Sequence, residues 1–170
     1  FSFSGGTLIG ENGYRCICSG NVAKTGGTYN AANLHITMVG TTSITWDGAY
    51  TARLGSLWFD GDVTVSSGLV TQGLKGISGS LSGSTVQVYY IDGIAPADAP
   101  VTIHNVVYAK STGATNNFDP LNYHFDDLRF EHINLGEGAT RYINIRQPFS
   151  GNIRSTGIVG VSAMTVRIVM

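Results

Sequence analysis

Two aspartates that flank a glycine are the first residues in the chain with a spacing suited to chemistry. Asp60 and Asp62 follow Trp58, and in an extended strand all three side chains would share one face, with the carboxyl groups roughly 6 to 7 Å apart. Glycoside cleavage uses two carboxylates at about this separation, beside an aromatic ring on which a sugar can rest. The same residues are typical of a hairpin turn whose acids bond their own backbone, which is the commoner case.

A second group of ionisable residues comes later, where acids and imidazoles are densest in the chain. Asp126, Glu131 and His132 would form a catalytic or sugar-binding site there, with Glu131 as a catalytic carboxylate. The structural alternative is that Asp127, Arg129 and Glu131 share one face of a strand and neutralise one another. This alternative is the simpler interpretation.

Two tryptophans stand beside predicted turns, where an exposed indole ring could stack on a sugar. Core packing explains most aromatic residues, but an exposed Trp is seldom without a function. The residues predicted to bind carbohydrate are therefore Trp46, Trp58, Asp126 and His132.

Other common kinds of site find no support. Cys16 and Cys18 are too close for an unstrained disulfide, and no further Cys or His pair completes a metal site, so we expect free thiols and no metal. No phosphate loop, calcium loop or G-x-S-x-G motif occurs, and we expect no cofactor. Charged residues make up only 12% of the chain and the net charge is −1, which disfavours nucleic acid as a partner. No apolar run is long enough for membrane insertion.

These residues must be positioned by short strands, because apolar and polar residues alternate in many segments that end at Gly, Asn or Asp. We expect a single all-β domain over residues 1–170, or the C-terminal fragment of a longer fibrous protein. Glycines recur so often between residues 55 and 83 that strands there should not exceed about six residues. The segment 73–83 resembles a flexible linker, although its Leu and Ile residues favour packed strands.

One segment favours a helical turn or two. Asp119 and Pro120 resemble a helix start, and Leu121, Phe125 and Leu128 follow at helical spacing. The β-branched and aromatic residues around this segment make it a local departure within a β protein.

Two architectures fit many short strands, namely an antiparallel jelly roll or sandwich and a parallel β-helix. No fixed repeat length is evident. Asn followed by an apolar residue suits the bends of stacked coils, and it suits sandwiches too. It occurs at Asn33, Asn105, Asn134, Asn144 and Asn152.

In its style the chain resembles the C-terminal part of a bacteriophage tailspike or tail-fibre receptor-binding protein. The resemblance rests on weak charge, abundant Gly, Ser, Thr and Asn, a missing start methionine, an apolar last strand, and strands with Asn at bends in 130–135 and 142–145. It implies a homotrimer at the virion surface, assembled in the host cytoplasm, that binds a bacterial surface polysaccharide. It carries over no catalytic residue.

Trimer formation would also cover the apolar stripe of the last strand, formed by Met164, Val166, Ile168 and Met170. We rank host attachment first among the functions, and a structural virion or fibre component without sugar binding second. A polysaccharide depolymerase, either a glycoside hydrolase or a lyase, ranks third, because binding requires less of the sequence than catalysis does.

Overall fold

The chain is all-β over the residues that the structure describes. The computed structural model describes residues 1–9, 15–30, 34–46, 53–91, 101–108, 115–118, 123–130, 139–146, 150–155 and 161–169. Every regular element in these segments is a strand, and every strand pairing is parallel. The fold is therefore a parallel β-solenoid, one of the two expected architectures, and the antiparallel jelly roll or sandwich is wrong. None of the described segments forms a helix with the length and apolarity needed to cross a membrane.

The strands follow one another in stacked coils. In chain order they are β1 (Ser2–Phe3), β2 (Thr7–Ile9), β3 (Arg15–Cys18), β4 (Val22–Lys24), β5 (Thr28–Asn30), β6 (His35–Val39), β7 (Thr42–Thr45), β8 (Leu54–Asp60), β9 (Val63–Val65), β10 (Leu69–Ser78), β11 (Ser80–Gly83), β12 (Val86–Ile91), β13 (Thr102–Tyr108), β14 (Thr115–Phe118), β15 (His124–Phe130), β16 (Ala139–Arg146), β17 (Ser150–Ser155) and β18 (Val161–Val169).

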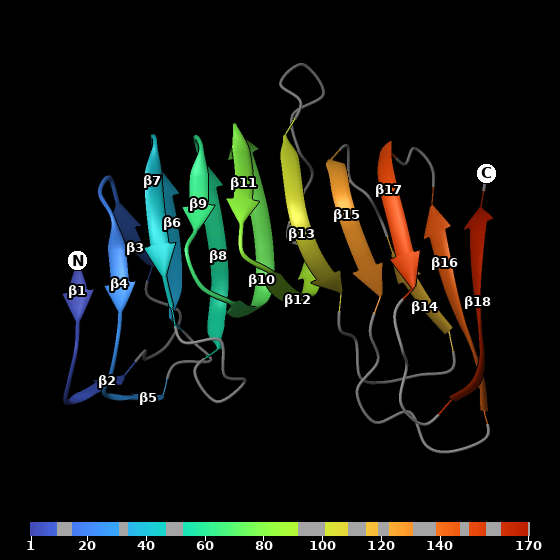
Figure 1. Cartoon of the computed structure of the whole chain (residues 1–170), viewed down its shortest axis with the longest axis horizontal. Coiled ribbons are helices and arrows are strands. Elements are labelled where there is room, and N and C mark those ends of the chain that lie inside the picture. The colour runs from blue at the N-terminus through green and yellow to red at the C-terminus, as the bar shows by residue number, and fades with distance from the viewer. Residues whose placement is uncertain are drawn as a thin grey trace.

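Two long faces run along the stack. Strands β1, β4, β7, β9, β11 and β13 lie side by side on one face, and β3, β6, β8, β10 and β12 form the other, with β13 joining the two. Figure 1 shows the two faces as front and back layers, with the N-terminus at one end of the stack and the C-terminus at the other. Smaller sheets pair β2 with β5, and β16 with β14 and β18.

The length of a coil varies along the chain, which hides the repeat in the sequence. Ser78 bonds to Asp60 at a separation of 18 residues, Trp46 to Ser67 at 21 and His104 to Asp126 at 22. A search for one fixed period fails because equivalent positions do not recur at one spacing. The solenoid is a repeat structure whose coils match in geometry and differ in length.

A column of glycines forms one corner of the solenoid. Gly40, Gly61 and Gly79 have φ angles of 79°, 131° and 77°, a region that side chains disfavour. A Cβ at Gly61 would lie 2.5 Å from the carbonyl oxygen of Gly40. Only glycine therefore allows successive coils to stack this closely at the corner.

A second corner uses Gly, Asn and Asp. Gly83, Asn105 and Asp127 have φ angles of 95°, 51° and 62°, and Asn and Asp are the side-chain-bearing residues that best tolerate this region. The Asn105 side-chain amide donates a hydrogen bond to the Gly83 carbonyl oxygen at 2.8 Å. The expectation of Asn at the bends of stacked coils is confirmed at Asn105.

The other Asn residues expected at bends differ in their positions. Asn144 lies within β16, and Asn152 lies within β17 next to a register shift against β15. Asn33 and Asn134 lie outside the described residues.

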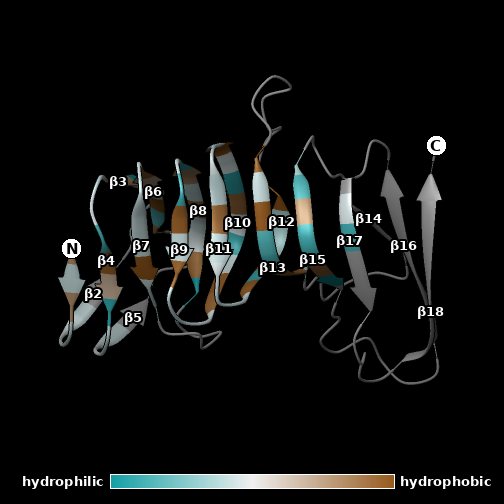
Figure 2. Cartoon of the chain, turned by 45° about the horizontal axis from the view of Figure 1, so that its top comes forward, coloured by the Kyte–Doolittle hydropathy of each residue, from teal (hydrophilic) through white to brown (hydrophobic). Residues whose placement is uncertain are grey.

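The core is a set of apolar columns inside the coils. Val63, Leu81, Ile103 and Phe125 are in register on four successive coils, and all are buried. Figure 2 shows hydrophobic and hydrophilic residues alternating along central strands such as β9, whose inner valines are buried and whose Thr64 is exposed. Removing these inner side chains from water is the main favourable contribution to folding.

The expected limit on strand length is wrong. Strand β8 has 7 residues and β10 has 10, and the segment 73–83 forms parts of β10 and β11 rather than a linker. Gly76 does not end β10, because its missing side chain makes room for core neighbours. A Cβ there would lie 2.6 Å from the Phe59 ring.

The expected helix start at Asp119, Pro120 and Leu121 lies outside the described residues. Phe125 and Leu128, which had completed the helical pattern, belong to strand β15. Both are buried although they are three positions apart, because Asp127 turns the chain between them at the second corner. Ile103 and Val106 have the same spacing around Asn105 on the coil before. A corner residue with positive φ thus reproduces a helical spacing of apolar residues.

A candidate binding face on the solenoid

The two aspartates proposed as a catalytic pair lie on either side of a corner. Asp60 is the last residue of β8, and Gly61 turns the chain before Asp62 leads into β9. The expectation that both carboxylates share one strand face is wrong, because Gly61 redirects the backbone between them. The catalytic role itself remains an expectation.

Each of these aspartates is hydrogen bonded to the next coil. The Ser78 hydroxyl donates to Asp60 Oδ1 at 2.6 Å, and the Ser80 hydroxyl donates to Asp62 Oδ1 at 2.9 Å. Both bonds join residues 18 positions apart, so they link the same two coils on either side of the glycine corner. This arrangement favours a structural role, in which the acids join two neighbouring coils. It differs from the expected hairpin turn, because the aspartates bond serine side chains of the next coil and the strands on either side pair in parallel.

Trp46 is buried, contrary to the expectation of an exposed ring. Only 2% of its surface is accessible, and it belongs to the hydrophobic core. Its backbone is held by Ser67, whose hydroxyl accepts from the Trp46 amide at 2.9 Å and donates to the Trp46 carbonyl. A sugar cannot stack on a ring that the core covers.

Asp126 lies on the outside of β15, beside an imidazole. Its Oδ2 is 2.9 Å from His104 Nδ1, and its Oδ1 accepts from the Asn152 amide at 3.5 Å. The bond with His104, followed by that with Asn152, lowers the pKa of the Asp126 carboxyl. Glu131 and His132, which were grouped with Asp126, lie outside the described residues, and the alternative ladder through Glu131 falls there too.

Trp58 lies on the outer side of the face formed by β3, β6, β8, β10 and β12, between two cations. The Arg15 guanidinium carbon is 3.4 Å from the centroid of the Trp58 ring, and the Lys75 ammonium nitrogen is 4.4 Å from it. Lys75 is paired with Trp58 across β10 and β8, whereas Arg15 comes from β3 on the other side of β8. Cations in such positions are attracted by the ring electrons.

Hydrogen bonds fix the polar side chains around this ring. Arg15 Nη1 donates to the Thr37 hydroxyl at 3.1 Å. One strand pair further, His35 Nδ1 lies 2.7 Å from the Ser56 hydroxyl. These hydrogen bonds restrict the orientation of the Arg15 guanidinium and the His35 imidazole in the protein without a ligand.

A second aromatic ring completes this surface. Tyr90 pairs with Gly73, which itself pairs with Ser56. A Cβ at Gly73 would lie 2.6 Å from Tyr90 Cε2, so the ring rests on the backbone where a side chain is missing. Tyr90 is 44% exposed. We call the outer surface formed by Arg15, His35, Trp58, Lys75 and Tyr90 the Trp58 face.

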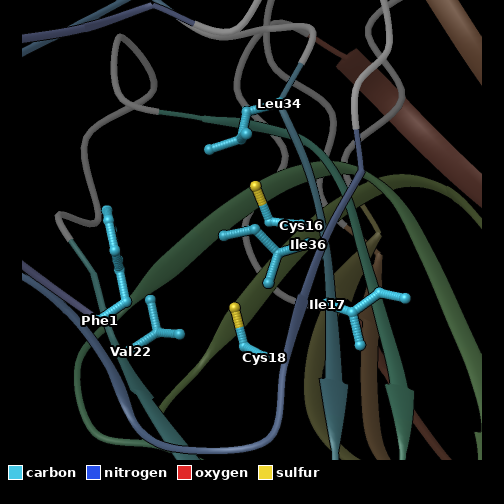
Figure 3. A pocket seen from close by; sticks show the side chains of 7 residues that line it. All are labelled: Phe1, Cys16, Ile17, Cys18, Val22, Leu34 and Ile36. Atoms are coloured by element: carbon cyan, nitrogen blue, oxygen red, sulfur yellow. The ribbon is translucent and has the colours of Figure 1, made fainter.

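The described part of the chain also holds an apolar pocket of about 330 Å³ near the N-terminal end. The side chains of Cys16 and Cys18 lie on its side of β3, and Ile17 points the other way (Figure 3). Both thiols are free, as expected, and burial, with a smaller effect of Cys16, raises the pKa of Cys18. The pocket is lined by Phe1, Cys16, Ile17, Cys18, Val22, Leu34 and Ile36.

No group of three or more His, Cys, Asp or Glu side chains is placed to hold a metal ion in the described segments. Comparisons of the chain with protein-family models, with curated proteins and with solved structures find no match. The geometry of the solenoid is therefore the ground for a functional proposal.

Sequence reasoning found Trp58 and missed most of its surroundings. Arg15 and Lys75 are far from Trp58 in the sequence, and only the strand register brings them to its ring. Tyr90 carries a signal, since it follows Tyr89 and comes shortly before Asp92 and Gly93, a pair of residues typical of turns. Gly73 could be recognised as its platform only once the pairing of β10 with β12 is known.

Proposed function

We propose that this chain is a host-attachment module that binds a bacterial surface polysaccharide through the Trp58 face. The observation that carries the proposal is the pairing of two aromatic residues with fixed polar groups on the outside of one sheet. Tyr90 is 44% exposed on this sheet, and Trp58 is held between Arg15 and Lys75. Aromatic surface gives a sugar ring apolar contact, while a few fixed polar groups orient it.

The shape of the face supports binding of an extended polymer. Its residues come from strands β3, β6, β8, β10 and β12, which lie side by side along the solenoid. Neighbouring strands are about 4.8 Å apart, so the face offers contacts at regular intervals along the stack. A chain of sugars, rather than a small compact ligand, suits such a surface.

Attachment is favoured over depolymerisation by the state of the acids. Asp60 and Asp62 are each engaged with a serine of the next coil. A catalytic pair has to work on one substrate from a shared cleft, whereas these carboxylates flank a corner. Depolymerase activity stays the weaker proposal.

A structural fibre component is the second candidate. The stacked glycines of one corner and the two Asp–Ser bonds beside it favour a stiff rod. Such a component would assemble normally and bind no sugar. Binding assays therefore separate it from an attachment module.

As part of the same proposal, the chain acts as a homotrimer at the virion surface. The support is the resemblance to tail-fibre proteins and the apolar stripe of the last strand, which needs a cover. Analytical ultracentrifugation of the purified protein should give the mass of three chains. A monodisperse monomer over a range of concentrations would contradict this part of the proposal.

The binding proposal is tested on an array of purified bacterial capsular and O-chain polysaccharides. The intact protein should bind a subset of them, and Trp58→Ala and Tyr90→Ala should each lose at least tenfold in affinity. Thr64→Ala is the matched control, because Thr64 is exposed on β9, on the other face of the solenoid. Equal binding by all four proteins would place the glycan elsewhere, and no binding to any polysaccharide would refute the function.

A further inference from the structure

The Trp58 face combines aromatic surface with positive charge. Arg15 is exposed and Lys75 is partly exposed, and both lie against the Trp58 ring. The whole chain has a net charge of −1, so this pair is a local feature and not a general basic composition. The nearest acid on β8 is Asp60, whose carboxylate accepts a hydrogen bond from Ser78.

The two cations are close enough to act on one ligand group. Arg15 Cζ and Lys75 Nζ lie 3.4 Å and 4.4 Å from the same ring centroid. Their separation is therefore at most about 8 Å, which is one Debye length at physiological ionic strength. A negative group beside the Trp58 ring would feel both charges.

The ring holds the cations in a useful orientation. A guanidinium that stacks on an aromatic ring directs its N–H groups sideways, in the plane in which carboxylates accept two parallel hydrogen bonds. The bond from Arg15 to Thr37 restricts that plane further. The Lys75 ammonium adds a compact charge from the next strand.

We infer that the polysaccharide bound by the Trp58 face is anionic, with carboxylate-bearing sugars such as uronic acids recognised by Arg15 and Lys75. This inference rests on the proposed attachment function and names its ligand class. Tyr90 supplies stacking surface that any sugar can use, whereas the cation pair at Trp58 selects those with negative charge. The two roles belong to different residues and can be separated.

The ligand side of the test uses the polysaccharide array, with a carboxyl-reduced copy of each uronic-acid polymer. Binding should be restricted to acidic polymers, and carboxyl reduction, which converts a uronic acid into its neutral sugar, should weaken it at least tenfold. Raising the salt concentration from 50 to 500 mM should weaken it as well, because exposed charges are screened. Strong binding to a phosphate-bearing polymer that survives carboxyl reduction would assign the charge to phosphate and overturn the carboxylate assignment.

The protein side uses variants that keep the side chains of similar size. Arg15→Gln and Lys75→Gln should each lower affinity for acidic polymers about fivefold, the effect of one exposed ion pair. Arg53→Gln removes the same charge just before β8, outside the Trp58 face, and is the matched control. Thermal unfolding followed by circular dichroism identifies any variant that fails to fold. Lys75→Arg, which keeps the charge, then replaces Lys75→Gln and should retain binding.

The outcomes distinguish this inference from the function on which it rests. Equal binding to neutral and acidic polymers, lost in Tyr90→Ala but not in Arg15→Gln, would leave the attachment function and overturn the anionic ligand. Absence of binding to every polymer would overturn both.

Discussion

Replacing glycines of the solenoid by alanine should give a graded loss of stability that follows the corner geometry. Gly20 has no neighbouring atom within 4 Å of a Cβ and no positive φ. Gly40 has a φ of 79° but open space around the Cβ, and Gly61 has a φ of 131° together with contacts to the Gly40 backbone. The same substitution therefore meets three conditions: no constraint at Gly20, backbone strain alone at Gly40, and backbone strain together with steric overlap at Gly61.

The expected magnitudes follow from these three environments. Gly20→Ala should leave the free energy of unfolding unchanged or raise it by up to about 1 kcal/mol, because the unfolded chain loses freedom. Gly40→Ala should cost about 1–2 kcal/mol of strain. Gly61→Ala should cost about 3 kcal/mol or more, since a Cβ 2.5 Å from the Gly40 carbonyl oxygen must push the coils apart.

Urea unfolding followed by far-UV circular dichroism, at one protein concentration for all variants, measures this series. In thermal unfolding of the same samples, the Tm of Gly61→Ala should fall by roughly 10 °C for a chain of this size. Equal stability of Gly61→Ala and Gly20→Ala would refute the stacking of Gly40 and Gly61 at the corner. That result would also remove the basis for placing Asp60 and Asp62 on either side of it.

Two further predictions concern ionisable groups. The Asp126 pKa is lowered in the folded state, so the contribution of this carboxylate to stability is present above the ordinary carboxyl pKa and is lost as the pH falls through the folded value. Urea unfolding at a series of pH values should show this loss in the wild type and not in Asp126→Asn. Identical acid profiles of the two proteins would contradict the bond between Asp126 and His104. Iodoacetamide should alkylate Cys16 faster than Cys18 at pH 8, because Cys16 is exposed and burial raises the Cys18 pKa. Mass spectrometry measures both alkylation rates, and the two rates should become equal in urea. Faster alkylation of Cys18 than of Cys16 in the folded protein would refute this order.

Alternation of apolar and polar residues was enough to predict an all-β chain of short strands. Val63, Thr64 and Val65 follow that pattern and form β9 with a buried, exposed, buried sequence. Asn105 was predicted at a bend of stacked coils and lies there. These predictions depend on local preferences, which each segment carries by itself.

The failures come from interactions between coils. Gly76 was interpreted as a strand breaker, but Phe59 and Val101 pack where its side chain would be. Asp60 and Asp62 were predicted to lie on one strand, but Gly61 turns the chain between them. That corner depends on close packing against Gly40 of the neighbouring coil, which the local sequence does not reveal. Contacts between neighbouring coils involve residues from separate segments, so they cannot be predicted from any one segment alone.

The candidate site shows the same division. Trp58 could be identified by its type and its position before a turn, but Arg15 and Lys75 could not be assigned to it. Their distances along the chain follow the register of β3, β8 and β10, and the coil length is not constant. Trp46 also precedes an Asp–Gly pair, one residue closer to it than Trp58 is to its own, yet Trp46 is buried in the core.

The most direct test of the central claim is the tryptophan fluorescence of the intact protein during titration with a polysaccharide that it binds. The chain has two tryptophans, and Trp46 is buried. The account predicts a saturable change in emission in the wild type, and its absence in Trp58→Phe, where only the buried Trp46 reports. The same change in Trp58→Phe, or no change in the wild type at saturating polysaccharide, would contradict binding at the Trp58 face.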